Sequence, residues 1–264
     1  MKFSIITIAW NDLDGLRKTV DSVRLQKFHN IEHIVIDGGS EDGTREYLAQ
    51  LDPSIKWVSE GDAGRYDAMN KGAKMATGDL LWFLHSSDIF HSSDTVNFVA
   101  AKYIQTPFMW GHGLSQIVDG SRILGIGGKI PFNHSRFLIG GHVIPHQATV
   151  FNKDFFWTIG GYDIDFGLSA DQMFMMKASM ASVPEVWGEL LCDFDALGAG
   201  SARGASAHYK DMSRARNVLG ISVTGFRITD MLLAVCCTFS TLLERFLRKI
   251  MRKTRPRLIS TGVL

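Results

Sequence analysis

The first 84 residues alternate between short apolar runs and segments with helical periodicity. The apolar runs are Phe3–Ala9, Ile34–Asp37, Ile55–Val58 and Leu80–Leu84. Helical spacing is clearest where apolar side chains recur three or four positions apart, at Leu13, Leu16, Val20 and Val23. Such an alternation is typical of a parallel sheet with right-handed helical crossovers. We therefore predict an α/β fold: a Rossmann-like, mainly parallel sheet flanked by helices, two of them at Thr44–Leu51 and residues 65–76.

The second half of the chain has weaker periodicity. Residues 106–141 are rich in glycine and predict short strands and loops. A strand at Gln147–Phe151 and helices at Ala170–Ala181 and Ser206–Leu219 follow. Because no repeat or low-complexity linker divides the chain, we predict one domain over residues 1–225 and a separate segment over residues 226–264.

The C-terminal segment is amphipathic, with apolar and basic residues on opposite faces of a helical wheel. The apolar face holds Phe239, Leu242, Leu243, Phe246, Leu247 and Ile250, and the basic face Arg245, Arg248, Lys249, Arg252 and Lys253. Its uncharged stretch, Met231–Leu243, is shorter than the roughly 18 apolar residues of a spanning helix. We expect this helix to lie in the membrane interface against anionic inner-leaflet lipid. The alternative is a helix packed on the domain with its basic face in water.

Composition and charge exclude several classes of protein. Hydrophobic residues make up 45% and charged residues 21%, which excludes disorder, collagen and a coiled coil. Seven basic residues follow Glu244; the first 244 positions keep 21 basic and 27 acidic residues, a net charge of −6 that argues against nucleic acid. Three cysteines supply no disulfide framework, and the start of the chain has no secretory layout. We expect a cytoplasmic protein, peripheral on the inner face of the cell membrane.

Polar and acidic side chains follow the predicted strands where a parallel sheet binds ligands, at the carboxyl ends. They are Asn11, Asp37, Glu60, Asp62 and Asp88. The sequence has no G-x-G-x-x-G after the first strand and no P-loop, so another device must neutralise a bound diphosphate. A carboxylate-bound Mg²⁺ or Mn²⁺ would do so, and Asp88 is placed to hold it. A turn or helix-capping role is the alternative for Asp88.

Four motifs in order carry a resemblance to a known family. They are Phe3-Ser-Ile-Ile-Thr7, Val35-Ile-Asp-Gly-Gly-Ser-Glu-Asp-Gly-Thr44, Tyr66-Asp-Ala-Met-Asn-Lys-Gly72 and Leu81-Trp-Phe-Leu-His-Ser-Ser-Asp88. Together they resemble the family 2 glycosyltransferases, which have the GT-A fold, over residues 2–204. The nearest likeness is to bacterial enzymes of colanic-acid and exopolysaccharide biosynthesis.

The resemblance implies donor-binding roles for matching positions. Nucleotide-pocket positions are Thr7, Ala9 and Asn11, with Asp37 on the base; Asp62, Tyr66 and Asp67 complete the nucleotide and ribose site, and Lys71 approaches phosphate. Asp88 corresponds to the metal-binding last aspartate of the family's D-x-D-like motif. The preceding position, often acidic in the family, is Ser87 here, so metal binding rests on Asp88 alone.

Further positions match other motifs of the family. His146 and Gln147 correspond to its His-Gln pair and are counted with the donor-binding residues. Asp171 corresponds to its general base, which takes a proton from the acceptor hydroxyl. Asp171 alternatively reads as a helix N-cap. Arg203, in a loop at residues 198–204 that resembles a lid, is available to the diphosphate. Zinc on His142 and His146 is not expected, because neighbouring glycines and Pro145 disfavour a helix there.

These implications lead to an expected function. The chain would transfer a sugar, with inversion, from a nucleotide diphosphate sugar, UDP favoured, to a hydroxyl of a polyprenyl-linked saccharide in cell-surface glycan synthesis. One alternative is a catalytically silent nucleotide-sugar-binding subunit of a polysaccharide assembly complex, which Ser87 makes conceivable. A sugar-phosphate nucleotidyltransferase is disfavoured, because its Gly-rich phosphate loop is missing after the first strand.

Overall fold

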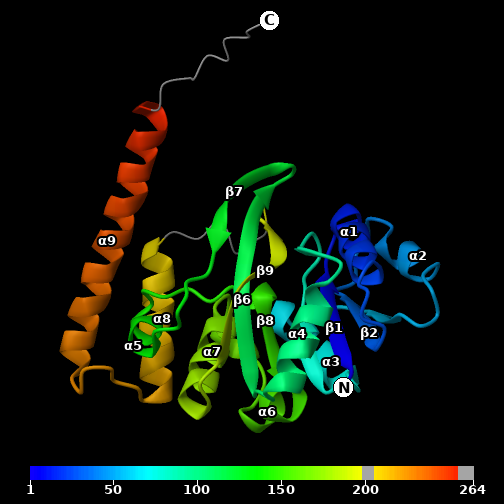
Figure 1. Ribbon diagram of the computed structural model, residues 1–264, viewed down its shortest axis with the longest axis horizontal. Coiled ribbons are helices and arrows are strands. Elements are labelled where there is room, and N and C mark those ends of the chain that lie inside the picture. Colours follow the sequence, from blue (N-terminus) through cyan, green and yellow to red (C-terminus); the bar gives the residue numbers. More distant parts are fainter. Residues whose placement is uncertain (198–204, 255–264) are drawn as a thin grey trace, which may run out of the picture.

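A computed structural model describes residues 1–197 and 205–254 of the chain (Figure 1). Within them, nine strands form one sheet in the order β3-β2-β1-β4-β8-β6-β9-β5, with β7 paired to β6. The strands are β1 (Phe3–Ala9), β2 (Ile31–Asp37), β3 (Lys56–Ser59), β4 (Leu80–Phe83), β5 (Ile89–Phe90), β6 (Trp110–Asp119), β7 (Arg122–Gly127), β8 (Thr149–Asn152) and β9 (Glu185–Asp195). The helices are α1 (Leu13–Arg24), α2 (Thr44–Leu48), α3 (Arg65–Met75), α4 (Thr95–Gln105), α5 (His134–Ile139), α6 (Lys153–Thr158), α7 (Ala170–Ala181), α8 (Ala205–Leu219) and α9 (Arg227–Thr254), with 3₁₀ turns at His146–Ala148 and Ile164–Phe166.

The predicted α/β architecture is confirmed in the first half of the chain. Strands β3, β2, β1 and β4 are parallel to one another, and α1 and α3 connect them as predicted. Their side chains pack on both faces of the sheet. Ile6 and Phe83 contact the core under α3 and α7, whereas Phe3 and Trp82 belong to the core under α4. This rigid half fixes where the carboxyl ends of the strands lie.

Beyond β4 the sheet is mixed. Strand β8 runs antiparallel to both β4 and β6, and β9 runs parallel to β6. The short pieces predicted for residues 106–141 include the ten-residue strand β6. Gly111 and Gly113 interrupt the apolar pattern by which a strand is predicted, but the pairing of β6 with β9 requires them. A Cβ at Gly111 would lie 2.6 Å from Trp187 of β9, and a Cβ at Gly113 would lie 2.6 Å from Leu191.

The amino ends of β1, β2 and β4 meet around a buried carboxylate, Glu32. Its oxygens accept hydrogen bonds from the Ser4 hydroxyl (2.5 Å), the Gly78 amide (2.9 Å) and the Lys56 ammonium (3.0 Å). Thr77 donates through both its amide and its hydroxyl. Burial by itself would raise the pKa of Glu32, but these hydrogen bonds outweigh it and hold the pKa well below its ordinary 4.5.

Helix α9 packs against α8 and α5 and extends past them at the edge of the molecule (Figure 1). Ala234 is buried with Ile139 and Tyr209, whereas Phe226 and Phe239 are 72% and 68% exposed. Among the described residues, no helix combines the length and apolarity that crossing a bilayer requires. The backbone continues as helix to Thr254, but the side chains of the expected basic face, from Arg245 onward, are not described.

Candidate functional site

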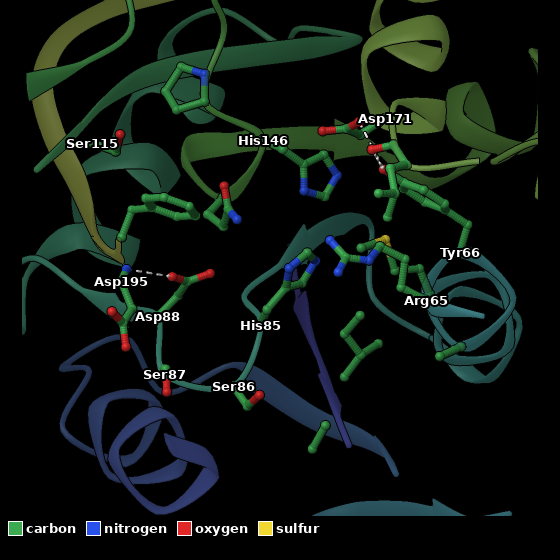
Figure 2. A pocket seen from close by; sticks show the side chains of 18 of the residues that line it. Arg65, Tyr66, His85, Ser86, Ser87, Asp88, Ser115, His146, Asp171 and Asp195 are labelled. Carbon is green, nitrogen blue, oxygen red and sulfur yellow. Dashed lines mark hydrogen bonds between the residues drawn. The ribbon is translucent and has the colours of Figure 1, made fainter. Parts of the chain in front are cut away.

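A cavity of about 1020 Å³ opens at the carboxyl ends of β1 and β4. Ala9 and Trp10 line it after β1, and residues 85–88 line it after β4. The facing wall comes from the second half of the chain, through residues 143–147, Asp171 and Asp195 (Figure 2). The parallel and mixed parts of the sheet thus each supply one side of a single cavity.

Seven of the predicted site residues line this cavity: Ala9, Asp62, Tyr66, Asp88, His146, Gln147 and Asp171. Five others do not: Thr7, Asn11, Asp37, Asp67 and Lys71. Arg203 and the predicted lid lie outside the described residues. The residues brought together come from the end of β1, the segment between β3 and α3, α3 itself, the turn after β4, the 3₁₀ turn at 146–148 and α7.

The predicted residues outside the cavity lining are engaged in other contacts. The Thr7 hydroxyl is fully buried and lies 2.9 Å from the Nε2 of His33. The Asp37 carboxylate accepts hydrogen bonds from the hydroxyls of Ser40 and Ser59. The Asn11 amide oxygen accepts the Glu41 backbone N–H at 2.9 Å. These contacts tie the loops after β1 and β2 together beside the cavity, and the nucleotide-binding roles of these residues stay predictions.

Lys71 lies among carboxylates. Its ammonium is 2.6 Å from Asp62, 3.0 Å from Glu60 and 3.4 Å from Asp67. The hydrogen bonds to Asp62 and Glu60 raise the pKa of Lys71, which keeps the ammonium charged. In this arrangement Lys71 neutralises the acidic rim next to α3, and its predicted approach to phosphate would require it to leave these partners.

Asp171 begins the first turn of α7 and faces the cavity. The Tyr66 hydroxyl donates to its Oδ1 at 2.9 Å, and Gln172 approaches its Oδ2 at 3.4 Å. Burial and the Asp171 charge raise the pKa of Tyr66, so the phenol stays protonated and acts as a donor. The carboxylate is thereby held by a side chain of α3 while its second oxygen keeps free accepting capacity.

Asp88 lies on the opposite side of the cavity and is only 3% exposed. Its Oδ1 accepts the Asp195 backbone N–H at 3.0 Å. Burial, with smaller contributions from the charges of Asp195 and Asp12, raises the pKa of Asp88 to about 8. A carboxylate so poorly compensated is suited to receive a cation.

The donor set fits a magnesium or manganese ion held mainly by its substrate. Asp88 offers carboxylate oxygens, the ligands that these hard cations prefer. In the part of the chain that is described, no three His, Cys, Asp or Glu side chains gather into a metal cluster. A cation at Asp88 would therefore complete its coordination with water and with oxygens of a bound diphosphate.

Ser87 does not substitute for the family's second acid in this geometry. Its hydroxyl donates to the Asp12 carboxylate at 3.0 Å, away from Asp88. Its backbone has φ of 71°, in the left-handed region that side chains other than glycine, asparagine and aspartate rarely adopt. The turn between β4 and β5 is thus held in a strained conformation that aims Asp88 into the cavity.

Two histidines lie between the two aspartates, with ring centroids 5.6 Å apart (Figure 2). His146 shares a 2.6 Å hydrogen bond with the Tyr162 hydroxyl through Nε2. Burial lowers the pKa of both His85 and His146, so both rings are neutral. Nε2 of His85 and Nδ1 of His146 are shielded from solvent and have no hydrogen-bond partner in the described chain.

No functional role was predicted from the sequence for some residues that line the cavity. Arg65 directly precedes one of the quoted motifs and His85 lies inside another, so their positions could have indicated that they belong to the site. Asp195 had no such signal, because it ends β9, a strand that the pattern did not predict. Its backbone N–H nevertheless holds Asp88, which links β9 to the cavity.

Comparisons with known proteins show which family the chain belongs to. A sequence model of glycosyl transferase family 2 matches residues 4–119. An uncharacterised glycosyltransferase of Mycobacterium tuberculosis is 48% identical over 216 residues, covering 80% of this chain and 81% of that protein. A PGL/p-HBAD biosynthesis glycosyltransferase of Mycobacterium bovis is 32% identical, covering 66% of this chain and 68% of its own length.

Solved structures share the fold at low sequence identity. Staphylococcus aureus TarS in complex with UDP-GlcNAc has a TM-score of 0.65 at 16% identity, covering 82% of this chain and 66% of that one, so this chain spans just under two thirds of its length. The Pyrobaculum calidifontis mannosyltransferase PcManGT, in complex with GDP-Man and Mn²⁺, has a TM-score of 0.60 at 14% identity and covers 97% of this chain and 81% of that one. The fold is therefore GT-A-like. With the family match and the identity to curated glycosyltransferases, the chain belongs to glycosyl transferase family 2 and is a glycosyltransferase.

Proposed function

We propose that this glycosyltransferase transfers a sugar, with inversion, from a nucleotide diphosphate sugar to a hydroxyl of a lipid-linked saccharide. The observation that carries the proposal is the placement of Asp88 and Asp171 on facing sides of one cavity (Figure 2). The two carboxylates can then act on opposite faces of a sugar bound between them. UDP is the favoured nucleotide, since TarS binds UDP-GlcNAc, although PcManGT binds GDP-Man.

In the proposed reaction Asp171 is the general base. Its Oδ2, the oxygen that Tyr66 does not hold, takes the proton from the acceptor hydroxyl as the hydroxyl oxygen attacks the anomeric carbon. The new glycosidic bond forms while the bond from the anomeric carbon to the diphosphate breaks, and the electron pair leaves with the diphosphate. Tyr66 keeps Asp171 in place throughout, because its hydroxyl donates to the other oxygen at 2.9 Å.

Asp88 works at the leaving-group end. It would hold Mg²⁺ or Mn²⁺, which stabilises negative charge on the departing diphosphate when bound. The Asp195 backbone N–H fixes the Asp88 carboxylate, so its orientation is set before a ligand arrives. The buried surroundings of Asp88 strengthen its interaction with any cation, because little water screens the charges.

Donor hydrolysis and transfer together test the proposal. Release of nucleoside diphosphate would be measured from UDP- and GDP-sugars with Mg²⁺ or Mn²⁺ and a mycobacterial lipid extract as acceptor source. The expected result is turnover that requires a metal, an acceptor and both aspartates. Asp154→Asn, in the first turn of the neighbouring helix α6 and outside the cavity lining, is the matched control. Full turnover by Asp171→Asn would contradict the assigned base.

The lipid-linked acceptor and a cytoplasmic, peripheral location are supported by α9. Ile228, Leu232 and Phe239 are exposed on this helix although they are apolar, as is Phe226 directly before it. We expect these side chains to enter the interface of the cytoplasmic leaflet, where a polyprenyl-linked acceptor would present its saccharide. A relative named for PGL/p-HBAD biosynthesis is compatible with such an acceptor. A role in colanic-acid or exopolysaccharide synthesis stays a prediction from the resemblance.

Vesicle flotation tests the membrane part separately. The full-length protein should float with vesicles of phosphatidylglycerol and phosphatidylcholine, and Phe239→Ser with Leu232→Ser should reduce the bound fraction. Ile104→Ser on α4 removes an equally exposed apolar side chain elsewhere and serves as the control. Equal flotation of all three proteins would refute the role of α9 without touching the proposed reaction.

A second candidate, a catalytically silent nucleotide-sugar-binding subunit, is favoured by one observation. Ser87 turns its hydroxyl to Asp12, so Asp88 is the sole acid of the motif that faces the cavity. This candidate predicts donor binding without turnover for every acceptor supplied. Asp171→Asn would then leave cellular function unchanged.

A further inference from the structure

Arg65 is the first residue of α3 and lines the cavity. Over the described residues, its guanidinium forms no ion pair, hydrogen bond or ring contact. Other cations near the site are engaged, since Lys71 pairs with three carboxylates and Arg214 lies over the Phe166 ring. Arg65 therefore presents to the cavity a guanidinium that no side chain of the described chain contacts.

The guanidinium points into the middle of the cavity, between His85 and Tyr66 (Figure 2). Besides burial, its charge lowers the pKa of both His85 and His146, which places it electrostatically next to the two rings. His146 is 4% exposed and its Nδ1 has no hydrogen-bond partner in the described chain, nor has Nε2 of His85. A neutral imidazole can donate one N–H, so these unsatisfied atoms are suited to a ligand with acceptor oxygens.

The backbone next to Arg65 also carries partial positive charge, because it is the amino end of helix α3. Gly64 caps α3 without a side chain, so no side-chain oxygen satisfies the first amides of the helix. The amino end of α3 adds partial positive charge on this side of the cavity, which Gly64 also lines. Helix, guanidinium and imidazoles thus favour the same kind of ligand.

The other charged side chains along the cavity wall are acidic: Asp12, Asp62, Asp88, Asp171 and Asp195. Among the described lining residues, Arg65 is the one lysine or arginine. A donor that brings negative charge would place it against Arg65 more favourably than against any other described part of the wall.

We propose that Arg65, His85 and His146 form a binding subsite for an anionic oxygen group of the donor. This inference rests on the proposed function, which assigns Asp88 to the diphosphate end and Asp171 to the acceptor end. Two groups of the donor carry this chemistry and lie between those ends: a phosphoryl group of the diphosphate, and a carboxylate on the transferred sugar. Arg65 would bind either one through paired N–H donors.

Binding and donor preference together separate the two sources. Calorimetric titrations with pyrophosphate, UDP, GDP and uridine would compare wild type with Arg65→Gln, Arg65→Lys and Lys74→Gln, an exposed control on the same helix. If the group is phosphoryl, Arg65→Gln should weaken diphosphate binding about ten- to hundred-fold and leave uridine unchanged. Arg65→Lys should recover part of the loss, because it keeps the charge but loses the bidentate geometry.

If the group is a sugar carboxylate, the diphosphate affinities should not change. The preference of wild type for a UDP-hexuronate over the matching UDP-hexose should then fall about ten- to hundred-fold in Arg65→Gln, in binding as well as turnover. His146→Gln should reduce the same preference in the same direction. Melting temperatures within a few degrees would show that the variants fold, as expected for a partly exposed side chain without partners.

The proposal is overturned if Arg65→Gln changes neither diphosphate affinity nor donor preference by more than about two-fold. It is also overturned if wild type binds none of the four probes and neither UDP-sugar. Donor binding that depends on Arg65 but leads to no turnover would instead refute the proposed reaction and leave the subsite standing.

Discussion

Two buried carboxylates lie at opposite ends of the same strands, and their surroundings differ completely. Glu32, at the amino ends of β1, β2 and β4, accepts hydrogen bonds from Ser4, Thr77, Gly78 and two lysines. Asp88, beyond the carboxyl end of β4, is as buried but faces further acids. The pKa of Glu32 is lowered from its ordinary value, whereas that of Asp88 is raised to about 8.

The difference separates stability from function within one sheet. A carboxylate that the protein itself fully compensates contributes to the free energy of folding and has no capacity left for a ligand. A carboxylate that the protein leaves under-compensated costs folding free energy, and a bound cation can restore the balance. The same contrast holds between Lys71, which pairs with three carboxylates, and Arg65, which faces the cavity.

The largest expected effect is on catalysis at the cavity end. Asp171→Asn keeps the shape of the side chain and an acceptor for Tyr66 but removes the proton acceptor. We expect kcat to fall about 10³-fold with nearly unchanged stability, because general-base catalysis is worth about 10²- to 10⁴-fold. Steady-state kinetics and thermal unfolding would be measured on the same samples. If Asp171→Asn lost as much stability as a core substitution, the separation of function from stability between the two ends of the sheet would be contradicted.

The largest effect on stability is expected at the opposite end. Glu32→Ala leaves the buried donors of Ser4, Thr77 and Gly78 without their acceptor, which should lower the free energy of unfolding by about 3 kcal/mol. Glu41→Ala, on an exposed loop beside β2, should have little effect. Urea unfolding would measure both, and kcat per folded molecule should be retained. Equal stabilities of the two variants would remove the role assigned to Glu32.

Acid-to-amide substitutions sharpen the comparison further. Glu32→Gln should destabilise the protein, whereas Asp88→Asn should stabilise it by about 1 kcal/mol at pH 8 in the presence of a chelator, because the amide removes a buried charge. Between the ordinary pKa of 3.8 and about 8 the unfolded chain ionises at Asp88 while the folded protein keeps the proton. Wild-type stability therefore falls as the pH rises through this range, and the gain from Asp88→Asn should increase with it. Chemical unfolding at pH 5 and pH 8 checks the sign. A destabilised Asp88→Asn would show that Asp88 is compensated after all.

The smallest effect is expected in mild acid. Since the folded pKa of Glu32 is lowered, its contribution to stability is fully present above its ordinary 4.5 and is lost as the pH falls below that value. Wild type should therefore lose more stability than Glu32→Gln between pH 5 and pH 3. Melting curves over this interval would measure the two slopes, and parallel slopes would mean that another group dominates the acid response.

The sequence predicted the parallel half of the fold because its strands are uniformly apolar. Trp82 and Phe83, inside the apolar run Leu80–Leu84, are fully buried. The long β6–β9 pairing could not be predicted, because Gly111 and Gly113 interrupt the strand pattern of β6 to admit Trp187 and Leu191. The need for glycine comes from contacts between segments about 75 residues apart, and a local sequence pattern contains no information about such contacts.

The candidate site was predicted only in part, because the sequence indicates residues next to regular elements and misses contacts between distant segments. Asp88 follows strand β4 and Asp171 lies in the first turn of α7, so each could be assigned from its motif and from its place beside a predicted element. Thr7 does not line the cavity, whereas its neighbour Ile8 does, and the Thr7 hydroxyl contacts His33, so its expected nucleotide-binding role stays a prediction. No role was predicted for Arg65, because a lysine or arginine at the start of a helix is common on a protein surface. That no other side chain contacts its guanidinium can be seen only in the structure.

The Tyr66 hydroxyl has a consequence for how such enzymes can be recombined. It joins α3 of the parallel half to Asp171 and to the Leu168 carbonyl of the second half, each at 2.9 Å. A chimera that exchanged the second half to accept a new hydroxyl would keep Tyr66 but would take its base from the other protein. Successful exchanges should therefore be those in which the new segment brings a carboxylate at position 171 within hydrogen-bond distance of the retained Tyr66 hydroxyl.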